Sequence, residues 1–109
     1  MNLNDIMRQA QEMQQKLQTE MKRAQEQLAR AEVEGQAGAG MVRVRMSGQL
    51  AVIKVGIDPT LIGGDRELLE DLVAAAVNDA INRAQELSKQ TMDPAKLGLP
   101  LPPGFKLPF

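Results

Sequence analysis

The feature that most constrains the fold is a stretch from Met41 to Ile57 in which apolar and polar residues alternate. Residues 47–50 separate it into two runs. The apolar members of each run share one side, namely Val42, Val44 and Met46 in the first run and Ala51, Ile53, Val55 and Ile57 in the second. Alternation with a period of two residues is typical of strands that bury one face. The stretch therefore predicts a β-hairpin with one apolar face.

The turn of this hairpin is predicted from Gly48, which stands at the first central position of a two-residue loop. Glycine at that position favours a type II′ turn. The resulting register sets inward residues opposite inward residues, pairing Ser47 with Leu50, Val44 with Ile53 and Val42 with Val55. Because an isolated hairpin is only marginally stable in water, we expect the segments on either side to cover its apolar face.

The segment before the hairpin has the periodicity of a long amphipathic helix. Residues 3–31 place an apolar residue at every third or fourth position: Leu3, Ile6, Ala10, Met13, Leu17, Met21, Ala24, Leu28 and Ala31. The spacing is close to the coiled-coil value of about 3.5 residues, and at about 1.5 Å per residue the helix is about 40 Å long. One small hairpin cannot cover such a helix, so we expect part of its stripe to contact another helix or another chain.

A second helix is predicted after the hairpin. Asp65 is a favourable N-cap, Lys89 suits the last turn, and Pro94 prevents continuation. Its broad apolar stripe consists of Leu68, Leu69, Leu72, Val73, Ala76, Val77, Ala80, Ile81, Ala84 and Leu87. A short alternating run around Val33 predicts a third strand at the edge of the sheet.

The composition argues against an enzyme. The chain of 109 residues contains no cysteine and no histidine, so Ser47 and Ser88 have no such base to activate them. No carboxylates show the spacing of a metal site. We therefore expect no cofactor, no metal and no small-molecule substrate. No run is long enough to span a membrane, and residues 1–15 lack the pattern of a signal peptide, so a cytoplasmic location without a membrane partner is expected.

The charge distribution restricts any anion-binding site to part of the surface. The net charge is −1 and the pI is about 5.4, which argues against a uniformly basic protein. Arg43, Arg45 and Lys54 are nevertheless concentrated on the predicted hairpin, with Arg43 directly opposite Lys54. Like charges opposed across strands are unfavourable, so a phosphate backbone or the nearby Glu32 and Glu34 should neutralise them. Along the first helix, acids and bases alternate at four-residue steps and largely compensate each other.

Six short stretches follow one another in a distinctive order: Met7–Gln11, Val33–Gly35, Gly38–Val42, Ile57–Pro59, Leu68–Ala76 continued by Asn78–Ala80, and Leu101–Phe105. In order and spacing the chain resembles the YbaB/EbfC family of nucleoid-associated proteins. The resemblance implies an α+β fold of helix-strand-strand-strand-helix with a small antiparallel sheet, a long N-terminal helix and a homodimer. Residues 1–92 would form the single dimerising domain, followed by a Pro-rich tail at 93–109, expected to be mobile unless it is a docking peptide.

The resemblance also implies binding of double-stranded DNA with little sequence preference, and a role in nucleoid organisation or gene regulation. The family has no motif that fixes the DNA contacts, so the candidates are basic residues of the first helix and the hairpin: Arg8, Lys16, Lys22, Arg23, Arg30, Arg43, Arg45 and Lys54. The alternative hypothesis is a prefoldin-like interaction or holdase module, in which Met7, Met13 and Met21 supply an adaptable apolar surface.

Overall fold

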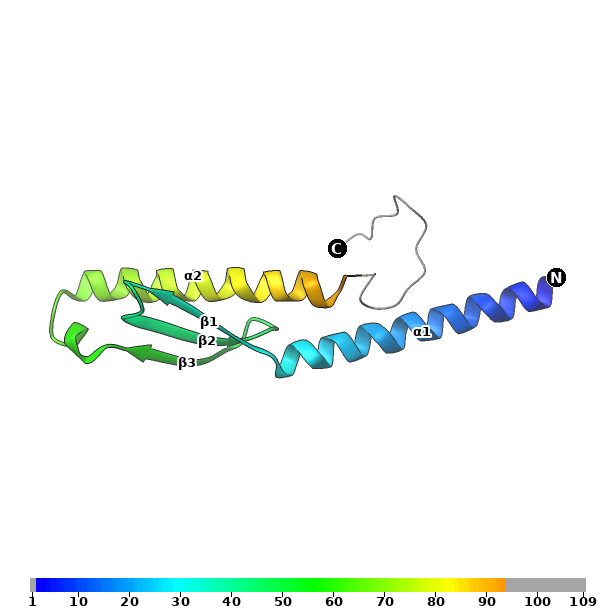
Figure 1. The fold of residues 1–109 in the computed structure, drawn as a ribbon, viewed down its shortest axis with the longest axis horizontal. Helices are drawn as coiled ribbons and strands as arrows, with labels where there is room; N and C mark the ends of the chain where they lie inside the picture. Colours follow the sequence, from blue (N-terminus) through cyan, green and yellow to red (C-terminus); the bar gives the residue numbers. More distant parts are fainter. Residues whose placement is uncertain (1, 94–109) are drawn as a thin grey trace.

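The computed structural model describes residues 2–93, and Figure 1 shows how the helices and strands are arranged. The elements follow in the order α1 (Leu3–Arg30), β1 (Glu32–Ala37), β2 (Val42–Ser47), β3 (Val52–Ile57), the short 3-10 helix η1 (Pro59–Leu61) and α2 (Arg66–Thr91). The strands form one antiparallel sheet in the order β1-β2-β3. The predicted order of helix, three strands and helix is confirmed. Apart from Asp93, the predicted tail at 93–109 lies outside the described residues.

The helix α1 begins at a capped N-terminus and projects from the body of the molecule. The Asn2 side chain accepts a hydrogen bond from the backbone N–H of Asp5 at 2.9 Å, which satisfies one donor of the first turn. Ala24 and Leu28, near the other end, are the buried residues of α1. Figure 1 shows α1 continuing past the end of α2, and the molecule measures 74 × 25 × 16 Å. Much of the apolar stripe of α1 therefore lacks cover from the rest of residues 2–93.

The core lies between α2 and the inner face of the sheet. Val42, Val44 and Met46 of β2 are buried against the alanines Ala76, Ala80 and Ala84 of α2. The alternation of β2 supplies the apolar face, and the four-residue spacing of the alanines supplies a smooth helix surface that can approach it closely. The apolar side of α2 is therefore occupied by the sheet of its own chain.

The closest approach between helix and sheet occurs at Gly35. A Cβ atom at this position would lie 2.6 Å from Ala80 Cα and closer still to the Ala76 carbonyl oxygen. Glycine is thus required for contact with a backbone that cannot move aside. Next to it, a carboxylate oxygen of Asp79 accepts hydrogen bonds from the backbone N–H of Gln36 at 3.0 Å and from Arg83 Nε at 3.1 Å. The Gln36 hydrogen bond, and then that of Arg83, lowers the pKa of Asp79, and the contact ties the β1 edge to α2.

The predicted hairpin exists, but its turn is not type II′. Ser47 N–H donates to the carbonyl oxygen of Ala51 at 2.8 Å, so the loop contains three residues, and Leu50 takes the positive φ of 67°. Gly48 is needed for a different reason, because a Cβ there would lie 2.6 Å from the carbonyl oxygen of Leu28. Its N–H donates to Ala31 at 3.1 Å, which joins the hairpin to the end of α1.

The longer loop shifts the register of the hairpin. The structure pairs Val42 with Ile57, Val44 with Val55 and Arg45 with Lys54, and a β-bulge follows between Arg45 and Met46. The predicted pairs of Ser47 with Leu50, Val44 with Ile53 and Val42 with Val55 are therefore wrong, as is the opposition of Arg43 to Lys54. The third loop residue moves the pairing by one position, and the bulge moves it by one more. Together they account for the shift of two positions along β3.

The strand β3 lies at the edge of the sheet and every one of its residues is exposed. The prediction that its apolar residues are covered by a helix is wrong for this chain alone, because α2 packs over β1 and β2. The exposed fractions of the four large residues are Val52 50%, Ile53 48%, Val55 41% and Ile57 36%. An apolar strand at an open edge is prone to pair with another chain unless something covers it.

We expect Gly35→Ala to lower the free energy of unfolding by about 2 kcal/mol, because the added methyl group forces α2 away from the sheet. The matched control is Gly56→Ala, where the nearest atom to an added Cβ is the Arg43 carbonyl oxygen at 3.9 Å. The control should change stability by no more than about 0.5 kcal/mol. Urea denaturation followed by circular dichroism measures both values, and equal values for the two variants would contradict this account of the core.

Candidate nucleic-acid interface

The outer face of the sheet collects three of the predicted DNA-contacting bases, but two of them are already paired. Arg45 donates from Nε and Nη2 to one carboxylate oxygen of Glu32, at 3.2 and 2.5 Å. Arg43 lies 3.7 Å from Glu34 and donates to the Gly40 carbonyl oxygen at 3.2 Å. The hydrogen bond with Glu32 raises the pKa of Arg45 above its ordinary value. The glutamates of β1 thus neutralise two bases of β2.

Lys54 is the remaining base of this face. It lies opposite Arg45 in the register and makes no ion pair with any residue between 2 and 93. The face therefore carries three bases against two acids. Its net excess of one positive charge makes it a weak anion-binding surface when taken alone.

The other five predicted bases are exposed on α1. At about 100° per residue they fall within a sector of about 120° on the side opposite the apolar stripe. We call this sector the basic face; it comprises Arg8, Lys16, Lys22, Arg23 and Arg30. The structure thus places all five predicted helix residues on one surface, where they outnumber the three acids of the same sector, Asp5, Glu12 and Glu26.

Ion pairs on the basic face are long and exposed. Arg8 lies 3.6 Å from Asp5, and Arg23 lies 3.4 Å from Glu20, with about 70% of each arginine side chain accessible. Within the described part of the chain, Lys16 and Lys22 have no ion-pair partner. Exposed pairs of this kind contribute at most about 1 kcal/mol each, so these bases can turn to an external anion at small cost.

An open pocket of about 520 Å³ lies on the basic face where α1 meets the sheet. Its lining consists of Arg23, Gln27, Arg30 and Ala31. Two guanidinium groups and a side-chain amide can each donate hydrogen bonds to a phosphate oxygen. Gln27 was not among the predicted contacts, although its position four residues after Arg23 and three before Arg30 places it on the same surface.

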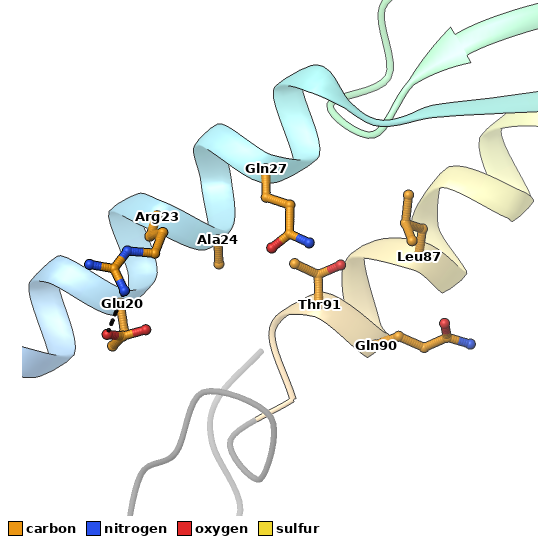
Figure 2. A pocket seen from close by; sticks show the side chains of 7 residues that line it. All are labelled: Glu20, Arg23, Ala24, Gln27, Leu87, Gln90 and Thr91. Atoms are coloured by element: carbon orange, nitrogen blue, oxygen red, sulfur yellow. Dashed lines mark hydrogen bonds and ion pairs between the residues drawn. The ribbon is translucent and has the colours of Figure 1, made fainter.

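A second pocket, of about 380 Å³, lies between α1 and α2 and is shown in Figure 2. Its walls carry Glu20 and Arg23, which pair with each other at 3.4 Å, together with Gln27, Gln90 and Thr91. None of these side chains is a nucleophile next to a base, so the pocket lacks the arrangement that covalent catalysis requires. Arg23 borders both pockets and links the basic face to the junction of the helices.

No group of three or more acidic, histidine or cysteine side chains between residues 2 and 93 is arranged to hold a metal ion. In the same range, neither helix combines the length and apolar character needed to cross a membrane.

Comparison with known proteins supports the fold and identifies the family. The crystal structure of the uncharacterized protein HP0035 from Helicobacter pylori superposes with a TM-score of 0.60, at 24% sequence identity over 68% of this chain and 87% of that chain. This similarity shows that the two chains share a fold. The sequence model of the YbaB/EbfC DNA-binding family matches residues 1–99, which is almost the whole chain. The chain therefore belongs to the YbaB/EbfC DNA-binding family.

Proposed function

We propose that this protein is a non-catalytic, nucleoid-associated protein that binds double-stranded DNA through the basic face of α1. Membership of a DNA-binding family supplies the class of partner. The observation that carries the choice of surface is the contrast between the two groups of bases. Arg45 is held on the sheet by two hydrogen bonds to Glu32, and Arg43 makes a longer pair of 3.7 Å with Glu34, whereas Lys16 and Lys22 are unpaired within the described residues. We therefore assign the main contact to α1, with Lys54 as an accessory contact.

The contact we propose is with phosphates rather than with bases. From Arg8 to Arg30 the basic face extends about 33 Å along α1, at about 1.5 Å per residue. This length is close to one turn of B-DNA, about 34 Å. Lysine and arginine contacts to phosphate position a protein on the duplex but carry no sequence information directly. Little sequence preference follows, as does a steep fall of affinity with salt.

A homodimer is the assembly we propose, with β3 in the interface. Val52, Ile53, Val55 and Ile57 form a nearly continuous apolar strand at an open edge of the sheet. At the opposite edge, the Gln36 N–H is already bound by Asp79 of α2. A second copy that brings the same β3 surface would cover both apolar strands at once. The dimer would present two basic faces and double the phosphate contacts, which suits a role in organising the nucleoid and in gene regulation.

The alternative of a prefoldin-like holdase has one observation in its favour. Leu3, Met7 and Met13 on α1 are between 47% and 70% exposed, and methionine-rich surfaces adapt to varied partners. In a prefoldin-like subunit two long helices pair along their length. Here the apolar side of α2 packs on the sheet. The two helices approach each other only near their C-terminal ends, so they do not pair along their length. The DNA-binding hypothesis is therefore preferred.

Two pairs of substitutions test the assignment of the DNA surface. We expect Arg23→Ala/Arg30→Ala to weaken binding to a labelled duplex by about tenfold or more at low salt. It should also lower the slope of log affinity against log salt by about 2 per subunit. The control, Arg43→Ala/Arg45→Ala, removes the same charge from the sheet and should have a clearly smaller effect. Fluorescence anisotropy across a salt series measures both quantities.

The result that contradicts this assignment is a loss confined to the Arg43→Ala/Arg45→Ala protein. That result would make the sheet the DNA surface. Binding by the wild type that is insensitive to salt, or restricted to one short sequence, would contradict the phosphate mechanism itself.

The dimer interface is tested by charge placed on β3. Val55→Glu/Ile57→Glu should convert the dimer to a monomer in sedimentation equilibrium, because burying two carboxylates between subunits is costly. Both positions are exposed in the single chain, so the variant should retain its circular dichroism spectrum. Leu3→Glu, at the far end of α1, should leave the dimer intact. A folded Val55→Glu/Ile57→Glu protein that still dimerises would show that β3 is not in the interface.

A further inference from the structure

The distal part of α1 carries an apolar stripe without cover from the described chain. We call it the distal stripe; it comprises Leu3, Ile6, Met7, Ala10 and Met13. Leu3 is 70% exposed, Met7 53%, Ile6 49% and Met13 47%. The buried residues of α1, Ala24 and Leu28, lie more than two turns further along the helix. Several large apolar residues aligned on one face of a projecting helix indicate a contact with another molecule.

The spacing of the distal stripe indicates that its partner is a helix. Leu3, Ile6, Ala10 and Met13 follow each other at intervals of three, four and three residues. This is the a and d pattern of a heptad, in which side chains from one helix fit between those of another. Within the described chain, the apolar side of the only other long helix, α2, already packs against the sheet. The helix with a stripe still available is therefore α1 of another copy.

The charges beside the distal stripe also fit a second copy. The positions that flank an a and d stripe decide which helices can pair, since like charges there repel. Over residues 2–14 these positions hold Asn2, Met7, Gln9 and Gln14, all uncharged, and the next flanking position is Lys16. Two α1 helices can thus approach through this surface without repulsion. If the flanking positions all carried charges of one sign, they would instead select a partner helix of opposite charge.

The distal stripe and the basic face lie on different sides of α1. From the positions of their residues, the two surfaces are about 170° apart around the helix axis. An α1 helix whose bases contact a duplex therefore directs its stripe away from that duplex. The same helix can hold DNA on one side and another helix on the other.

We propose that the distal stripes of α1 helices from two DNA-bound dimers pair with each other and so bridge two DNA duplexes. The proposal rests on the proposed function, since the basic face must hold the DNA. The contact is short, about three helical turns, and short helical pairings are weak in isolation. On DNA the dimers lie close together and several contacts form at once, which raises the effective concentration of the stripes. Free dimers should thus remain dimers, and bridging should appear on DNA.

The test compares capture of a second duplex with binding of a single one. A duplex is immobilised on beads, the protein is added, and retention of a fluorescent second duplex is measured. The variant is Ile6→Gln/Met13→Gln, because glutamine keeps the helix propensity and adds no charge. The matched control is Gln11→Ala/Gln15→Ala, on exposed positions outside the distal stripe. Single-duplex affinity of each protein is measured in parallel by fluorescence anisotropy.

We expect Ile6→Gln/Met13→Gln to reduce retention of the second duplex at least tenfold while single-duplex affinity changes less than twofold. The control should retain both activities. Undiminished bridging by Ile6→Gln/Met13→Gln would overturn the proposal. So would dissociation of the free dimer by this variant in sedimentation, because the stripe would then be covered within one dimer. Failure of the wild type to bind a single duplex is a separate result, and it would overturn the proposed DNA function.

Discussion

Close packing of Gly35 against the backbone of α2 fixes where that helix lies on the sheet. The alanines at 76, 80 and 84 bring α2 onto β1 and β2, and Asp79 binds the edge of β1 at Gln36. This contact uses the apolar side of α2 and two of the three strands. Within the described part of the chain, it leaves β3 and the distal part of α1 without cover. The two surfaces that we assign to assembly are thus the parts of the apolar surface that α2 cannot reach.

Charge pairing separates two groups of bases that look alike in the sequence. On the sheet, Glu32 and Glu34 of β1 lie diagonally across from Arg45 and Arg43 of β2, and the strand pairing keeps each glutamate near its arginine. On α1 the bases extend into solvent with long or absent pairings. Phosphate can displace an exposed ion pair on the helix more easily than the two hydrogen bonds by which Arg45 holds Glu32. This difference is the reason to assign the DNA contact to the projecting helix.

The sequence predicts the helices and strands and their order well, because their periodicities are local properties of each segment. The register of the hairpin could not be predicted, since Gly48 is explained by its approach to Leu28, a contact between distant segments. The exposure of β3 depends on where α2 packs, which no pattern within β3 reveals. Neutralisation of the hairpin bases by Glu32 and Glu34 was one of two predicted alternatives, the other being a phosphate backbone, and the ion pairs show that the glutamates contribute. The DNA contacts stay a prediction. We assign the main contacts to the basic face, with Lys54 as an accessory contact.

The central claim is that the basic face of α1 holds the DNA. Its most direct test is a nuclear magnetic resonance titration of the isotope-labelled protein with a short duplex at low salt. The account predicts that amide shifts concentrate on α1 between Arg8 and Arg30 and reverse when salt is added. Shifts concentrated on β1 and β2, with α1 unchanged, would contradict it and return the DNA contact to the sheet.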